Sequence, residues 1–98
     1  MKKLKVTPKV VENVTTVVDE DGGPFVMLGK VVYVSCTSYA YTGKLTGVND
    51  KFIELEEVEI VYETGPWSGK VFKGTEKLPT KTLCIFLNQV ESMFELVR

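Results

Sequence analysis

Residues 41–52 read YTGKLTGVNDKF, with two glycines four positions apart and an Asn-Asp pair between two apolar segments. Asn49 and Asp50 predict a turn, because side chains of these types hydrogen-bond to the backbone of the turn itself. Gly43 and Gly47 fall inside the preceding strand pattern, where glycine marks a bend or the close approach of another backbone. The stretch is therefore interpreted as a β-hairpin whose first strand is strongly bent.

Alternation of apolar and polar residues predicts a strand on each side of this turn. Residues 32–36 alternate valine and cysteine with tyrosine and serine, which predicts a strand before the hairpin. Residues 51–63 form a long strand after the turn. Within it the alternation restarts after Glu57, which indicates a bulge or bend at Glu56-Glu57.

The C-terminal part returns to a strand pattern after an interruption. Residues 64–80 are rich in Gly and Lys and are interpreted as a long loop or an extended hairpin. Residues 81–97 supply two strands joined at Asn88-Gln89. With the three strands above, this makes five.

The N-terminal segment is interpreted differently. Thr7 before Pro8 suits a helix N-cap followed by the first helical position. The apolar residues then fall at helical spacing, at Val10, Val11, Val14, Val17 and Val18. Five valines are poor helix formers, so for residues 8–18 a strand stays the alternative to a helix.

Taken in order, the elements predict a mainly β protein. One domain is expected over residues 1–98, with an N-terminal helix and loop in 1–24 and a barrel in 25–98. Five strongly bent antiparallel strands of this length can close into a small barrel, and both OB-type and SH3-type barrels fit the pattern.

Composition and charge argue against several classes of function. The net charge is −1 and Arg98 is the one arginine, so no duplex DNA binding is expected from a chain without a dense cationic face. The chain has no histidine, and no motif places a nucleophile beside a base. We therefore expect no enzyme activity, no metal site and no cofactor.

The cysteines and the hydropathy indicate the compartment. Cys36 and Cys84 each lie in an apolar strand pattern and are predicted to be buried thiols that act as small hydrophobic residues. No apolar run approaches membrane-spanning length, and residues 1–6 do not resemble a signal peptide. A cytoplasmic protein without membrane contact is expected.

Two segments carry a resemblance to a known family. GKVVYVSC together with YTGKLTGVND resembles the first sequence motif of the Sm/LSm proteins, which include Hfq. The matching residues are Gly29, Lys30, Val32, Val34, Tyr41, Gly43, Leu45, Gly47, Val48 and Asn49. IFLNQV, residues 85–90, has the outline of the second motif. The resemblance covers about residues 25–96 and implies a helix followed by a five-stranded, strongly bent SH3-type barrel.

The same resemblance implies assembly. Sm-like proteins form rings in which strand four of one subunit pairs with strand five of the next. Residues 83–87 are apolar on both faces of the predicted strand, and an unpaired apolar edge needs a partner to cover it. The candidate interface residues of a homo-oligomeric ring are Leu83, Cys84, Phe86, Met93 and Phe94. The alternative is that this strand is central within one barrel.

RNA binding is the function that the resemblance implies. In RNA-binding members a stacking side chain, an Asn and an Arg hold uracil; these positions carry Lys51, Ile53 and Phe86 here, and Leu87 replaces a glycine. Isoleucine and phenylalanine lack the donors and acceptors that base readout needs. The remaining candidate contacts for single-stranded RNA are Tyr39, Asn49, Asp50, Lys51, Asn88 and Gln89. Turn formation alone is the alternative role of the Asn, Asp and Gln residues.

We therefore expect a ring-forming Sm-like protein that acts as an RNA-binding or RNA-chaperone-type module through altered contacts. The alternative is a structural or scaffolding ring that binds no nucleic acid. The near-neutral charge and the missing base-reading residues favour that alternative.

Overall fold

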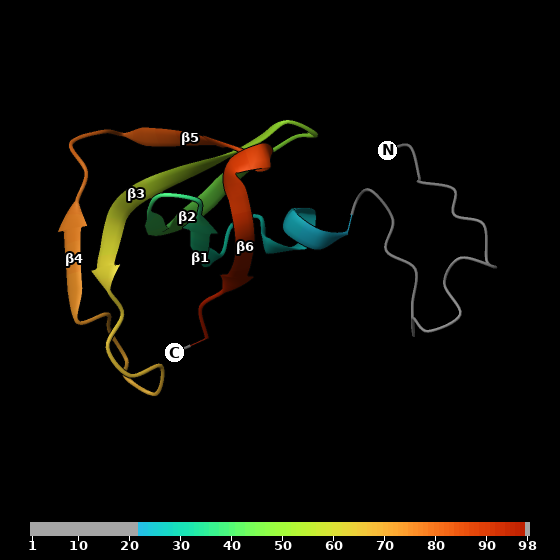
Figure 1. The fold of residues 1–98 in the computed structure, drawn as a ribbon. Helices are drawn as coiled ribbons and strands as arrows, with labels where there is room; N and C mark the ends of the chain where they lie inside the picture. The colour runs from blue at the N-terminus through green and yellow to red at the C-terminus, as the bar shows by residue number, and fades with distance from the viewer. Residues whose placement is uncertain (1–21, 98) are drawn as a thin grey trace.

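The computed structural model describes residues 22–97, which form a mainly β fold (Figure 1). A 3-10 helix, η2 (Gly23–Met27), leads into the strands β1 (Val31–Cys36), β2 (Ala40–Val48) and β3 (Phe52–Glu63). The strands β4 (Gly74–Lys77) and β5 (Thr82–Phe86), the 3-10 turn η3 (Leu87–Gln89) and the strand β6 (Val90–Glu95) follow. The helix predicted for residues 8–18 lies outside the described residues.

All strand pairs are antiparallel and belong to one sheet. Its order is β4-β3-β2-β1-β6, and β5 also pairs with β3, along the first half of that strand. β5 and β6 thus lie at opposite margins of the sheet, although only η3 separates them in the chain. Three residues span about 10 Å, whereas four strand spacings of a flat sheet span about 19 Å. The sheet must therefore be rolled up, as Figure 1 shows.

The roll is not a closed barrel, because β5 and β6 do not pair with each other in the part of the chain that the structure describes. The sheet also has six strands, one more than the five that the sequence predicted. The sixth, β4, lies within the predicted loop 64–80, where Gly74–Lys77 pairs with the second half of β3. This pairing corresponds to the extended hairpin that the sequence left open as the alternative to a loop.

The concave side of the roll holds the core. Its fully buried side chains come from β1, β2 and β3: Val32, Val34, Leu45, Ile53, Leu55 and Val58. Ile85 adds to this cluster from β5 and is 7% exposed. Burial of these branched side chains supplies the main free energy that holds the two margins together.

The predicted bend at Glu56-Glu57 is confirmed. The β2–β3 register shifts between Thr42 and Lys44, and Glu57 has a φ of 53°, a left-handed conformation that is rare outside glycine. Gly43 faces this bulge across the strand pair. A Cβ at Gly43 would lie 2.9 Å from the carbonyl oxygen of Glu56, so the glycine permits the close backbone approach that the sequence predicted.

We expect Gly43→Ala to destabilise the fold by about 1–3 kcal/mol, because the backbone of β3 must move to admit the methyl group. Gly47→Ala is the matched control. There the nearest atom is the Cβ of Glu54, at 3.2 Å, and the two strands can shift by a few tenths of an ångström. Urea unfolding of the two variants checks this difference, and equal free energies of unfolding would contradict the tight contact at Gly43.

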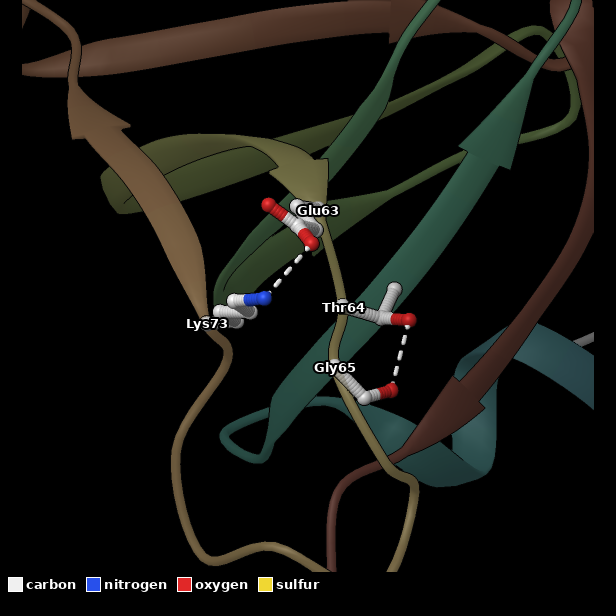
Figure 2. A network of polar contacts seen from close by, with 4 residues as sticks. All are labelled: Glu63, Thr64, Gly65 and Lys73. Atoms are coloured by element: carbon white, nitrogen blue, oxygen red, sulfur yellow. Dashed lines mark hydrogen bonds and ion pairs between the residues drawn. The ribbon is translucent and has the colours of Figure 1, made fainter.

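The β3–β4 connection folds back onto the outer face of β1 and β6. The rings of Trp67 and Phe72 lie 5.4 Å and 5.5 Å from that of Tyr33, which stacks on Phe94 at 5.2 Å. At the base of the connection Lys73 Nζ lies 3.1 Å from a Glu63 carboxylate oxygen (Figure 2). That ion pair is largely exposed and adds little stability, so the aromatic cluster is the main attachment of this connection.

Candidate functional site

The short turn η3 lies between the β1–β2 turn and the β2–β3 turn. The N–H of Leu87 donates to the carbonyl of Lys51 at 2.8 Å, which joins η3 to the β2–β3 turn. The carbonyl of Gln89 accepts from the N–H of Thr37 at 3.1 Å, which joins η3 to the β1–β2 turn. The structure therefore brings the β1–β2 turn and the β2–β3 turn together beside η3, which is distant from both in the sequence.

Asn49 has the turn-forming role that the sequence left open as an alternative. Its Oδ1 accepts from the backbone N–H groups of Lys51 and Phe52, each at 2.8 Å. This bonding fixes the β2–β3 turn and leaves the Asn49 amide nitrogen to face outward or bind a ligand. Asp50 and Lys51 are exposed at the same turn.

The remaining candidate RNA contacts surround η3. Tyr39 is 60% exposed, Asn88 and Gln89 are exposed, and Tyr39 and Gln89 line the same cavity. The candidate set therefore lies on both sides of η3, with Tyr39 at the β1–β2 turn and Lys51 at the β2–β3 turn. Lys51 is the one cation in the set and Asp50 the one anion, so the six residues together have no net charge.

Two residues stand at the positions compared above with the uracil-binding residues of Sm-like proteins, and their side chains point to opposite sides: Ile53 into the core and Phe86 to the surface. Ile53 is fully buried in the core, opposite Ile85 across the β3–β5 pair. Phe86 is 57% exposed, and its ring lies 6.1 Å from that of Phe52. Neither side chain could hydrogen-bond a base in this arrangement, because Ile53 is directed inward and both are hydrocarbons.

β5 is a margin of the sheet, and it is apolar on both faces. Ile85 is buried and Leu83 half-buried on the core side, whereas Cys84 and Phe86 are exposed on the other side. Within residues 22–97 β5 pairs with β3 alone, so its second edge carries no strand. β6 has the same property, since it pairs with β1 alone.

A cavity of about 220 Å³ runs along the unpaired edge of β5. Four consecutive residues of the strand line it, Leu83 to Phe86, and neighbouring residues of a strand point to opposite faces. The cavity must therefore lie beside the edge rather than over one face. Tyr39 and Tyr41 form part of its far wall.

The other candidate interface residues lie on β6. Met93 packs against the core from the inner side of the roll. Phe94 is 42% exposed on the outer side, where it belongs to the aromatic cluster with Tyr33 and Trp67. Sequence reasoning missed this cluster, because Trp67 lies in a segment without periodicity and only the folded connection brings it to Tyr33.

The prediction of buried cysteines is wrong for Cys84 and holds only in part for Cys36, which packs against the core. Cys36 is half-buried and Cys84 is exposed, because no strand covers the outer face of β5. Burial, and then the charge of Glu91, raise the pKa of the Cys36 thiol, which lowers its reactivity as a thiolate. Burial also raises the pKa of Tyr41, with smaller contributions from Cys36 and Tyr39.

In residues 22–97 no three side chains of His, Cys, Asp or Glu lie close enough together to hold a metal ion. No helix in these residues has the length and apolar character needed to cross a membrane.

No model of a known protein family matches the chain, and a search of curated proteins also gives no match. The resemblance to Sm-like proteins therefore stays a prediction from the motif residues of the sequence.

Proposed function

We propose that the protein is a divergent Sm-like module that assembles edge to edge into a homo-oligomeric ring and binds single-stranded RNA around η3. The observation that carries the proposal is that β5 and β6 each pair along one edge only within residues 22–97, so that each has a second edge without a partner strand. β5 has five residues and β6 has six, so they are matched in length for pairing between copies. A head-to-tail contact of this kind closes into a ring when its rotation permits.

The apolar character of the β5 margin supports this assembly. The exposed ring of Phe86 and the thiol of Cys84 would be covered when β6 of a neighbouring copy entered beside β5. Edge strands that stay solvent-exposed are normally protected by charge or proline, and β5 has neither.

RNA binding is the second part of the proposal. Tyr39 offers an exposed ring for stacking, which every base permits, and Lys51 offers a contact to phosphate. Stacking replaces the hydrogen-bonded base readout that Ile53 and Phe86 do not supply. Weak sequence preference and a shallow salt dependence are therefore expected, since about one lysine per subunit contacts the strand.

Tyr39→Ala is expected to weaken RNA binding by about fivefold or more, because loss of one stacking platform typically costs about 1–3 kcal/mol. Tyr39→Phe is the matched control and should retain the affinity, since it keeps the ring. Fluorescence anisotropy with short uridine-rich and adenine-rich RNA at two salt concentrations measures both. Absence of binding by the wild-type protein at micromolar concentration would reject the RNA part of the proposal and leave assembly untouched.

The second candidate is a scaffolding ring without nucleic acid. It is favoured by the burial of Ile53 and by the absence of net charge on the six candidate RNA contacts. Light scattering combined with absorbance at two wavelengths separates the candidates, because it gives the mass of the assembly and detects nucleic acid that copurifies with it.

A further inference from the structure

A second cavity, of about 550 Å³, lies on the outer side of β1–β2–β3, away from η3 and away from the β5 edge. The β3–β4 connection forms one wall through Val71 and Phe72, and Val31 and Leu96 contribute further apolar side chains. The aromatic cluster positions this wall, because the Phe72 ring packs 5.5 Å from that of Tyr33. A cavity of this size is within the range that holds small organic ligands.

One carboxylate lies among these apolar side chains. Glu59 lines the cavity, and its Oε1 accepts a hydrogen bond from the Thr75 hydroxyl at 2.6 Å. This bond holds the carboxylate in place and leaves Oε2 able to accept another donor. The hydroxyl of Thr42, which also lines the cavity, is already committed to the carbonyl of Val32 at 2.9 Å.

The neighbouring lysines do not neutralise this carboxylate. Lys73 pairs with Glu63 instead, as Figure 2 shows, and Lys77 is exposed although it lies opposite Glu59 in the β3–β4 register. Within residues 22–97 Glu59 forms no ion pair. The negative charge is thus available to a cation that enters the cavity.

Glu59 also marks the boundary between apolar and polar space. A neighbouring cavity of about 460 Å³ shares Val31, Thr42 and Glu59 with the first, and continues to Lys44 and Glu57. Lys44 and Glu57 carry opposite charges that offset each other in the neighbouring cavity, whereas Glu59 is the one charged residue that lines the first cavity. A cationic ligand at Glu59 would then place its apolar body on the other side, against Val71 and Phe72.

From this arrangement we propose that the cavity binds a small primary amine with an apolar body. The ammonium group donates to Glu59 Oε2, and the body packs against Val31, Val71 and Phe72. A charge-assisted hydrogen bond in a half-buried site is strong enough to discriminate an amine from an uncharged isostere. This site goes beyond the proposed function, because it needs neither assembly nor RNA.

The test uses cyclohexylmethylamine as the probe, with cyclohexylmethanol and cyclohexanecarboxylate as its neutral and anionic counterparts. Trp67 is the single tryptophan of the chain and belongs to the cluster that supports the cavity wall, so its fluorescence reports binding. The amine is expected to bind about tenfold or more tightly than the alcohol, and the carboxylate to bind least. Equal affinities of amine and alcohol, or no fluorescence change with any probe, would overturn the proposal.

Two variants separate the head group from the body of the ligand. Glu59→Gln should reduce the affinity for the amine to that of the alcohol and leave the alcohol unaffected. Val71→Ala, at a position 77% exposed and therefore harmless to folding, should weaken amine and alcohol alike. Glu76→Gln is the matched control, since its exposed side chain is on β4 but outside the cavity. Retention of amine selectivity in Glu59→Gln would show that another group binds the ammonium.

Discussion

Phe86→Glu is expected to convert the proposed ring into monomers. The Phe86 ring is 57% exposed in a single copy, so its replacement costs little within that copy beyond the contact with Phe52. In the proposed ring the new carboxylate would be enclosed beside β6 of the neighbour without a cation to pair with. Burial of an unpaired charge costs several kcal/mol, which weakens each contact by about 100-fold or more. Light scattering measures the resulting fall in mass.

Val26→Glu is the control for this experiment. It makes the same change of charge at a residue that is 69% exposed on η2 and belongs to neither β5 nor β6, and the mass should not change. A Phe86→Glu protein that kept the wild-type mass would place the interface elsewhere. A wild-type protein that stayed monomeric at high concentration would remove edge-to-edge assembly altogether.

The local pattern of the sequence was enough to predict the bends of the sheet. Gly43 and the interrupted alternation at Glu56-Glu57 act through backbone sterics between neighbouring strands, and the predicted hairpin contains both sides of that contact. The sixth strand was not predicted as such. β4 has only four residues, GTEK, and no apolar alternation, and it forms because β3 is long enough to pair with it beyond β5.

Part of the candidate site was also predicted, because its turns have signals in the local sequence. The turn at Asn49-Asp50 and the joint at Asn88-Gln89 have local signals, and strand order alone indicates that they lie near each other. Which face of a strand is buried, however, cannot be predicted from the residues of that strand alone. The exposure of Cys84 follows from β5 being a margin, which depends on how the whole sheet rolls. The cavity at Glu59 needs the β3–β4 connection to fold back, and in the sequence Glu59 resembles any residue of a solvated strand face.

Ile53→Asn tests whether the position that carries Asn in RNA-binding Sm-like proteins has become a core position. Ile53 is fully buried opposite Ile85, so the change removes a packed side chain and encloses an amide among hydrocarbon groups. Loss of the packing alone costs about 2–5 kcal/mol, and an unsatisfied amide adds about 1–3 kcal/mol. The total approaches the whole stability of a small domain, which is about 5–15 kcal/mol. Urea unfolding should show a protein that is barely folded, or unfolded, in buffer.

Ile53→Val is the matched control for that variant. It keeps the hydrocarbon and removes one methylene group, so a loss of about 0.5–1.5 kcal/mol is expected. Because the side chain of residue 53 points into the core, Ile53→Asn should also gain no affinity for uridine-rich RNA in any fraction that stays folded. An Asn variant as stable as the Val variant, with stronger RNA binding, would mean that this side chain turns outward toward the ligand. The position would then belong to the RNA site, and stacking on Tyr39 would not be the main source of affinity.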